Sequence, residues 1–296
     1  MREYFQPSKG GSRAAHAHVF DSVAEMVERC EQPASPAQAP SLVQRIAHRS
    51  GGDEWAYGTL KDAATYNRTM REGWRDALPR IEALAAKVSP KVAAPLDVRR
   101  KIRKGPDGDE LDIHQVYGGN LGKAWTARKR TVARAPAPIR LICNVVYNSG
   151  ADSTAFFWRG ACALAMVRAL RKKGYRTAIS GLGLLVSPYA NSPRNGLDYV
   201  ARFDALSYGQ AIDTARLAAV LCTSAMLRHV IFHTILTTPP QVNGGFGYAP
   251  SDAQSTRCIV ECGAFPNASE ERLVIPDISN EHSAGEWLAK VSAQFA

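Results

Sequence analysis

Hydrophobic positions follow two different periods along the chain, and the change falls near residue 139. Upstream, apolar residues recur at three- and four-residue steps in Phe20–Cys30 and Arg71–Val88, a spacing that predicts amphipathic helices. A further short helix is predicted to begin at Lys61. Downstream, continuous apolar runs alternate with helical patterns, which favours strands that are buried on both faces. We therefore expect a helical N-terminal region followed by an α/β domain.

The clearest part of the downstream half is a βαβ unit. The run IRLICNVVY (139–147) predicts a buried strand, Thr154–Lys173 predicts a helix that ends at Gly174, and residues 175–188 predict a second strand, parallel to the first. Further strands are predicted at 198–203, 256–262 and 273–278, and further helices at 208–221, 225–236 and 281–295. This alternation predicts an α/β fold, a three-layer Rossmann-like sandwich with a helical N-terminal region.

The same patterns predict three parts of the chain. Residues 1–48 are expected to be a flexible arm, a short helix and a Pro/Ala-rich linker, because 1–18 is polar and without period and 31–41 is rich in Pro, Ala and Ser. Residues 49–96 are expected to be helical. Residues 97–296 are expected to form the α/β domain, which opens with a basic segment at 97–140.

Positive charge is concentrated in that basic segment. The 296-residue chain has 37 Lys and Arg against 27 Asp and Glu, a formal net charge of +10, and its 45% hydrophobic content excludes a wholly disordered chain. Residues 97–140 alone carry 11 basic and 5 acidic side chains. Nine of the basic residues form two clusters: Arg99, Arg100, Lys101, Arg103 and Lys104, then Arg128, Lys129, Arg130 and Arg134.

These clusters predict a surface that binds phosphates, with Trp125 and Tyr117 available to stack on unpaired bases. DNA, RNA or an acidic protein would satisfy the charge. The alternative is a solvated strand edge whose lysines and arginines prevent pairing with another chain. An acidic insert between the clusters, residues 107–112, is expected to neutralise part of the surface.

The βαβ residues also resemble a known family. The sequence NVVYNSG followed by FFWRGACALAMVRALRKKGYR is similar to the opening βαβ unit of a von Willebrand factor A-type domain. Upstream, WAYGTLKDAATYNRTMREGW and DGDELDIHQVYGGN resemble poorly characterised phage and mobile-element proteins that carry such a domain. The resemblance implies a Rossmann-like sheet and a binding role rather than catalysis.

The resemblance departs from the family at the metal site. A metal-binding A-type domain ends its first strand with Asp-x-Ser-x-Ser, whose oxygens hold Mg²⁺. This chain has Asn144 and Val146 at the first two of those positions, so no metal is expected. The carboxyl ends of the strands remain the expected binding edge for a partner. The side chains expected to line it are Asn144, Asn148, Ser149 and Asp152.

Other candidate chemistries are incomplete in the sequence. His229 and His233 have a spacing that can hold a metal but no evident third ligand, so packing is favoured. Cys258 and Cys262 lack a second pair for zinc, and the glycines of GLG (181–183) do not form a phosphate loop. Asp198 and Asp204 flank a strand and are expected to cap or end it. No cofactor is expected.

Three functional hypotheses follow. The first is a non-enzymatic binding protein that contacts nucleic acid through residues 97–140. The second is an assembly or scaffold module that binds another protein subunit at the edge of the sheet. The third is a metal-dependent hydrolase that uses Asp152 or the two histidines. No apolar run reaches roughly 18 residues and no signal peptide is evident, so a cytoplasmic protein without membrane contact is expected, in the host cytoplasm if a phage encodes it. The six scattered cysteines are expected to be reduced.

Overall fold

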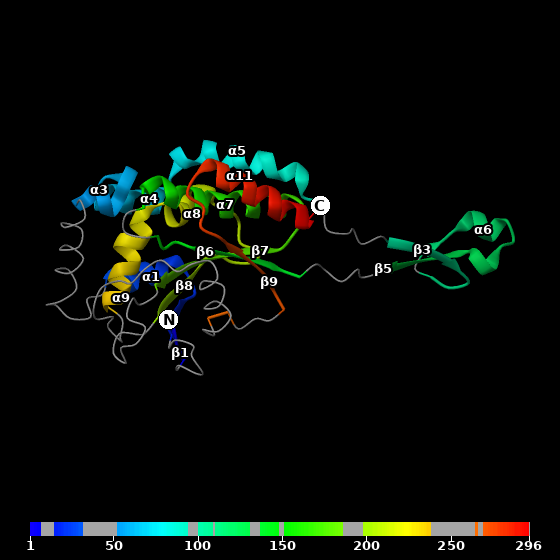
Figure 1. Cartoon of the computed structure of the whole chain (residues 1–296). Coiled ribbons are helices and arrows are strands. Elements are labelled where there is room, and N and C mark those ends of the chain that lie inside the picture. Colours follow the sequence, from blue (N-terminus) through cyan, green and yellow to red (C-terminus); the bar gives the residue numbers. More distant parts are fainter. Residues whose placement is uncertain are drawn as a thin grey trace, which may run out of the picture. The chain divides into compact units, whose positions relative to one another are not determined.

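The computed structural model describes most of the chain, in two compact units. The described residues are 1–6, 15–31, 52–93, 100–108, 110–130, 137–147, 151–185, 198–237, 264–265 and 269–295. The main unit comprises Met1–Ala93 and Pro138–Ala296, and the small unit comprises Ala94–Ala137. The small unit is therefore an insertion between the helical N-terminal region and the first central strand of the main unit (Figure 1).

A mixed sheet forms the centre of the main unit. Its described strands, in spatial order, are β1 (Arg2–Gln6), β2 (Ala15–Phe20), β8 (Asp198–Leu206), β7 (Thr177–Leu185), β6 (Ile139–Asn144) and β9 (Glu271–Ile275). The pairs β2–β8, β6–β7 and β6–β9 are parallel, and the pairs β1–β2 and β7–β8 are antiparallel. The main unit is thus mixed α/β, compatible with a Rossmann-like arrangement.

The predicted βαβ unit is confirmed. All six residues of β6 and all nine of β7 are buried, and the two strands are parallel. The glycines of GLG lie within β7, where they make room for neighbouring side chains. A Cβ on Gly181 would lie 1.9 Å from the ring of Phe203, and one on Gly183 would lie 2.8 Å from Ile231. The glycines therefore serve packing in a strand, in agreement with the expectation that they form no phosphate loop.

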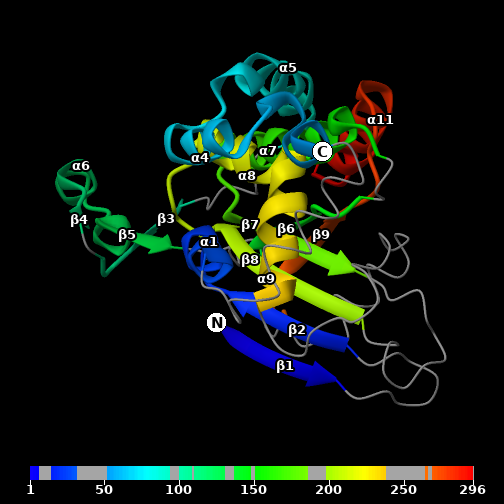
Figure 2. The ribbon, with the colours of Figure 1, turned by 90° about the vertical axis from the view of Figure 1, so that its left-hand side faces the viewer.

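The helices of the main unit share one apolar core with one face of the sheet. Helix α7 (Ser153–Lys172) crosses β6 and β7. Figure 2 shows α5 (Leu78–Val88), α8 (Thr214–Leu221) and α11 (Glu281–Ser292) on the same side of the strands as α7. Every described helix of this unit contributes to that core. The others are α1 (Val23–Glu31), α3 (Gly52–Tyr57), α4 (Ala63–Glu72), a π-helix (Met226–Ile231) and α9 (Phe232–Thr237).

The opposite face of the sheet carries a second, smaller core. It is made by alternate strand residues such as Val19, Ile142 and Leu182, together with Ala264 and Phe265. In the part of the chain that the structure describes, helices therefore cover only one face of the sheet. The α/β class is confirmed, whereas the expected third layer is not seen among these residues.

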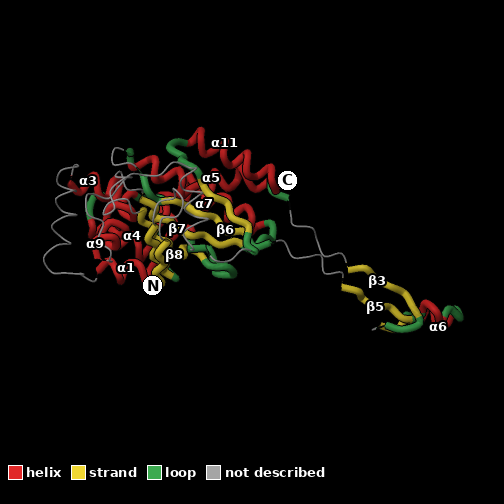
Figure 3. The backbone as a smooth tube through the Cα atoms, turned by 60° about the horizontal axis from the view of Figure 1, so that its bottom comes forward, coloured by secondary structure: helices red, strands yellow, loops and turns green. Residues whose placement is uncertain are grey.

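The small unit is built around a three-stranded antiparallel sheet. Strand β5 (Trp125–Arg130) lies between β3 (Arg100–Gly105) and the short β4 (Glu110–Leu111), and helix α6 (Ile113–Tyr117) lies in the connection between β4 and β5 (Figure 3). Single 3₁₀ turns complete the described elements, at Gly58–Leu60, Arg75–Ala77, Ser89–Lys91, Leu121–Lys123 and Ala293–Phe295.

The expectation of a flexible arm at the N-terminus is wrong in part. Arg2–Gln6 and Ala15–Phe20 are not a mobile arm but the strands β1 and β2, and β2 joins the sheet by pairing with β8. The helix that was predicted to begin at Lys61 is α4, and Asp62 caps it by accepting a hydrogen bond from the backbone of Thr65. The predicted strand 256–262 and the Pro/Ala-rich linker lie outside the described residues, apart from Glu31 at the end of α1.

No single described helix is both long and apolar enough to cross a membrane; only the bent pair Thr214–Leu221 and Met226–Thr234 meets the length and composition criteria together.

Two glycines in helices test the packing of α7. A Cβ on Gly160 of α7 would lie 2.2 Å from the carbonyl oxygen of Leu221, whereas one on Gly285 of α11 would meet nothing within 4 Å. We expect Gly160→Ala to lower the free energy of unfolding by about 1–3 kcal/mol through overpacking. Gly285→Ala should raise it by up to about 1 kcal/mol through helix propensity. Urea denaturation of both variants would measure this, and shifts in the same direction would contradict it.

Candidate functional site

The structure brings the two basic clusters together. Strands β3 and β5 are antiparallel neighbours, so two clusters that are well separated in the sequence occupy one hairpin-like ladder (Figure 3). Arg100 is paired with Arg130, and Lys101 with Lys129. Of the remaining cluster residues, Arg103 and Lys104 lie further along β3, Arg128 lies on β5, and Arg99 and Arg134 lie outside the described residues.

This register is electrostatically unfavourable for the isolated small unit. Directly opposed residues of an antiparallel pair have Cβ atoms about 5 Å apart, and like charges at such positions repel. Two successive pairs of like charge therefore reduce the stability of this ladder until an anion screens them. Because successive residues of a strand belong to opposite faces of the sheet, the Arg100–Arg130 pair is on one face and the Lys101–Lys129 pair is on the other. A polyanion that lies against either face would therefore relieve the repulsion of the pair on that face.

One residue of the acidic insert pairs with a lysine near the end of the β3–β5 ladder that is opposite to the Arg100–Arg130 pair. Lys104 Nζ donates to Asp112 Oδ2 at 3.0 Å, and this hydrogen bond lowers the pKa of the Asp112 carboxyl. The other oxygen of Asp112 accepts from the backbone of Gln115 and so caps α6. The expected neutralisation is thus observed at Lys104, near α6 and away from the two rungs of like charge.

Trp125 lies at the boundary between the ladder and α6. It is the first residue of β5, is paired with Gly105 on one side and Leu111 on the other, and is 36% exposed. Its indole is therefore accessible at the end of the β3–β5 ladder that is opposite to the Arg100–Arg130 pair.

Of the residues that were expected to line the partner-binding edge, Asn144 is buried and Asp152 is exposed. Asn144 is 5% exposed, and its side-chain oxygen accepts hydrogen bonds from the backbone of Val146 (3.2 Å) and Leu184 (3.4 Å). The expectation that Asn144 lines a partner surface is therefore wrong: the amide joins the ends of β6 and β7. Asp152 is exposed and caps α7 through the backbone of Thr154. Asn148 and Ser149 lie outside the described residues.

A buried arginine that the sequence analysis missed occupies this end of the sheet. Arg159 of α7 is 5% exposed, and its Nη1 donates to the carbonyl oxygens of Asn144 (2.6 Å) and Val146 (3.0 Å). Its Nε donates to the carbonyl oxygen of Pro276 at 3.1 Å, and its Nη2 pairs with Asp277 at 2.6 Å. A permanent cation thus links the carboxyl ends of β6 and β9. An arginine placed between the apolar runs AFFW and GACALAMV of this helix was the available signal.

These residues do not fit the Mg²⁺ site that the family resemblance implies. The guanidinium of Arg159 binds the strand-end carbonyl oxygens of Asn144 and Val146, and the Asn144 amide oxygen already accepts two backbone hydrogen bonds. A divalent cation would have to compete with a positive charge that is already in place. In addition, the described residues contain no group of three or more His, Cys, Asp or Glu side chains that could hold a metal ion.

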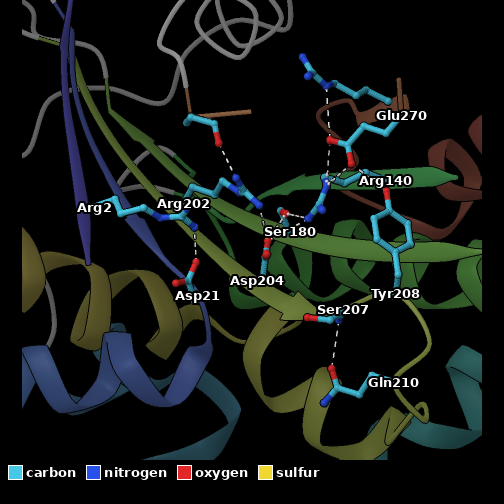
Figure 4. Close-up of polar contacts among 12 residues, drawn as sticks. Arg2, Asp21, Arg140, Ser180, Arg202, Asp204, Ser207, Tyr208, Gln210 and Glu270 are labelled. Carbon is cyan, nitrogen blue, oxygen red and sulfur yellow. Dashed lines mark hydrogen bonds and ion pairs between the residues drawn. The ribbon is translucent and has the colours of Figure 1, made fainter. Parts of the chain in front are cut away.

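A second buried ionic network crosses the opposite ends of the strands (Figure 4). Arg140 of β6 donates from Nε to Glu270 at 3.0 Å and from Nη1 to Asp204 of β8 at 2.9 Å. Arg202 also pairs with Asp204 at 2.8 Å, and the hydroxyl of Tyr208 donates to Glu270. Asp204 was expected to cap or end a strand, but it lies within β8 and is paired with two arginines. The network joins neighbouring strands and offers no free carboxylate for acid–base chemistry.

A cavity of about 800 Å³ lies between α1, α4, α8 and the end of β8. Its apolar wall includes Val27, Met70 and Leu217, and its polar residues include Asn67 and Gln210. Its volume falls in the range of small-molecule sites.

His229 borders this cavity and is mostly withdrawn from solvent. Its Nδ1 lies 3.3 Å from the hydroxyl of Tyr57, while Nδ1 of His233 lies 2.6 Å from the carbonyl oxygen of His229. Burial, together with the neighbouring His233, lowers the pKa of His229 to about 4. The pair is therefore packed and hydrogen-bonded in the core, as the sequence analysis favoured, and is neutral near pH 7.

A family model whose description is "Domain of unknown function (DUF7192)" matches residues 10–295. The chain belongs to the DUF7192 family. The match extends over both units, so the small basic unit is part of the family domain rather than an appendage to it. No curated protein and no solved structure matches the chain.

The buried arginine of this DUF7192 chain should be important for its stability. We expect Arg159→Met to lower the free energy of unfolding by about 2–3 kcal/mol, because buried carbonyl oxygens lose their donor. On the same helix, Arg168→Met removes a half-exposed side chain that lies 3.8 Å from Glu82, and should cost less than about 1 kcal/mol. Urea denaturation measures both. Equal losses would show that Arg159 is not a specific link.

Acid should destabilise the protein through His229. The unfolded histidine takes up a proton near pH 6.5, whereas the folded one does so near pH 4. Stability is therefore fully present above pH 6.5 and falls as the pH drops toward 4. His229→Gln should flatten this part of the stability profile, measured by urea denaturation at a series of pH values. A profile that keeps its slope in the variant would contradict the assignment.

Proposed function

We propose that this DUF7192 protein is a non-enzymatic binding protein that contacts nucleic acid through its basic segment, residues 97–140. The observation that carries the proposal is the register of β3 and β5, which places Arg100 opposite Arg130 and Lys101 opposite Lys129. These like-charge pairs lower the stability of the free protein, and phosphates that lie against them would remove that penalty. The alternative is protection of the strand edges: among the described residues β4 pairs only with Trp125 and Thr126, so both β3 and β5 have an open edge at the two like-charge pairs.

The chemistry of the main unit supports a role in binding rather than catalysis. Asp204 and Glu270 are paired with arginines, and burial raises the pKa of the Cys143 thiol to about 12. Burial likewise raises the pKa values of Cys162 and Cys222. Thiols with raised pKa values carry little thiolate and are poor nucleophiles.

We also infer that the main unit is a von Willebrand A-like domain whose metal site is degenerate. The parallel unit β6–α7–β7 supports this arrangement, as does the position of Asn144 at the end of β6. In this domain a guanidinium, that of Arg159, supplies the positive charge at the strand ends.

Neutralising one rung tests the nucleic-acid proposal. Lys101→Gln with Lys129→Gln removes one like-charge pair, so the free energy of unfolding should not fall and loss of binding cannot be ascribed to misfolding. Two lost phosphate contacts should reduce the slope of log K against log salt concentration by about 1.4 to 1.8. Fluorescence anisotropy with labelled DNA and RNA at several salt concentrations measures this slope.

The matched control carries the same two changes on the main unit, Lys91→Gln with Lys290→Gln. These lysines are exposed, and the control should keep the wild-type slope. Binding that is absent at low salt, or a slope that the Lys101/Lys129 variant leaves unchanged, would contradict the proposal. That outcome would favour the alternative, a scaffold that binds another protein.

A further inference from the structure

The small unit exposes an unusual set of large apolar side chains. Five of them lie within residues 111–125, and Met1 is the only other exposed large hydrophobic side chain among the residues that the structure describes. We call these five residues the apolar tip. They are Leu111 (46% exposed), Ile113 (56%), Tyr117 (86%), Leu121 (64%) and Trp125 (36%).

The apolar tip is an ordered feature of the backbone. The amide of Asp112 donates to the carbonyl oxygen of Ala124 at 2.7 Å, and that of Asn120 donates to Gln115 at 2.9 Å. Gly119 has a positive φ of 77°, which allows the chain to turn directly after α6. Tyr117 is thus held at the surface by the fold of its own connection. Monomeric proteins rarely expose a contiguous apolar patch without a partner for it.

Charge indicates which partner covers the tip. Trp125 belongs to the tip and is also the first residue of β5, whose other end carries Lys129 and Arg130. Trp125 and Lys129 are four residues apart and so are on the same face of β5, and at about 3.4 Å per residue the nearer like-charge pair is roughly 14 Å from Trp125. One occupant that contacts both regions must be anionic along its length and must also present flat apolar faces. Single-stranded nucleic acid has both properties, whereas a duplex hides the faces of its bases.

We propose that the apolar tip binds unpaired bases, with Tyr117 as the principal stacking residue, and that the protein prefers single-stranded over double-stranded nucleic acid. This inference rests on the proposed function, because the basic ladder must hold the backbone while the tip takes the bases. An aromatic ring stacks on any base, so the preference is for strand state and not for sequence. An acidic protein would instead use the aliphatic members of the tip as much as Tyr117.

Substitutions at Tyr117 separate stacking from general hydrophobic contact. Tyr117→Leu keeps an apolar side chain but removes the ring, and Tyr117→Phe keeps the ring. The full-length protein is titrated with fluorescein-labelled oligothymidylate, oligouridylate and a mixed-sequence duplex at several salt concentrations. We expect Tyr117→Leu to weaken binding to at least one single-stranded probe roughly five- to 150-fold and to leave duplex binding unchanged. Tyr117→Phe should bind like the wild type.

Leu121→Ala is the matched control, because it shortens an exposed aliphatic residue of the same tip. It should weaken binding to the two single-stranded probes much less than Tyr117→Leu does, because it removes no aromatic ring, and circular dichroism should show that all variants are folded. Stacking carries no net charge, so Tyr117→Leu should lower affinity without changing the salt slope, unlike the Lys101/Lys129 variant.

Each failure has a distinct signature. If the charge variant changes the salt slope while Tyr117→Leu binds single strands like the wild type, the stacking inference is wrong and the nucleic-acid function stands. An effect of Leu121→Ala as large as that of Tyr117→Leu would show general hydrophobic contact in place of ring stacking and so contradict the inference, and duplex binding equal to single-strand binding would likewise overturn it. If no probe binds at low salt, both the inference and the proposed function fail.

Discussion

Burial of helix α7 on every side is the constraint on which the main unit depends. Its seven consecutive residues Ala161–Val167 have no exposed surface, although an isolated helix on a sheet would leave one face in water. The sheet covers one face of α7, and α5, α8 and α11 pack around the rest. The N-terminal helical region therefore cannot swing freely: α5 supplies part of the cover that α7 requires. Gly160 shows how close this packing is, because its neighbour on α8 leaves no space for a methyl group.

Such a core leaves little room for charge, yet four arginines are buried among the residues of the main unit that the structure describes. Arg140, Arg159, Arg202 and Arg228 are all buried. Their guanidinium groups bind strand-end carbonyl oxygens, pair with Asp204, Glu270 and Asp277, or lie over aromatic rings. Because a guanidinium has five donors in one plane, a single side chain can satisfy several acceptors that the ends of different strands leave unpaired. The arginines thus connect elements that are far apart in the sequence.

The two units consequently use positive charge in opposite ways. In the main unit, the buried arginines donate hydrogen bonds to oxygen atoms of the same unit. In the small unit, cations are set opposite one another on β3 and β5, beside the largest exposed apolar side chains that the structure describes. Electrostatic repulsion and exposed hydrophobic surface both lower the folding stability of the small unit. An anionic, partly apolar partner would restore that stability when it binds. This contrast between the two units is the physical basis for the proposal that residues 97–140 bind a partner.

Local patterns in the sequence determined those elements whose environment is uniform along their length. Strands β6 and β7 are buried on both faces and α7 on all sides, so continuous apolar runs marked them, and the charge of residues 97–140 was evident from composition. Strands β1 (REYFQ) and β2 (AHAHVF) were not predicted because each is short and lacks the continuous apolar run that marked β6 and β7, and because β2 joins the sheet through β8, a strand from the distant C-terminal half of the chain. Pairing over such separations leaves no local signal. The tertiary structure alone decided that the two basic clusters face each other, that Asn144 points inward and that Arg159 supplies the cation at the strand ends, since each depends on contacts between distant segments.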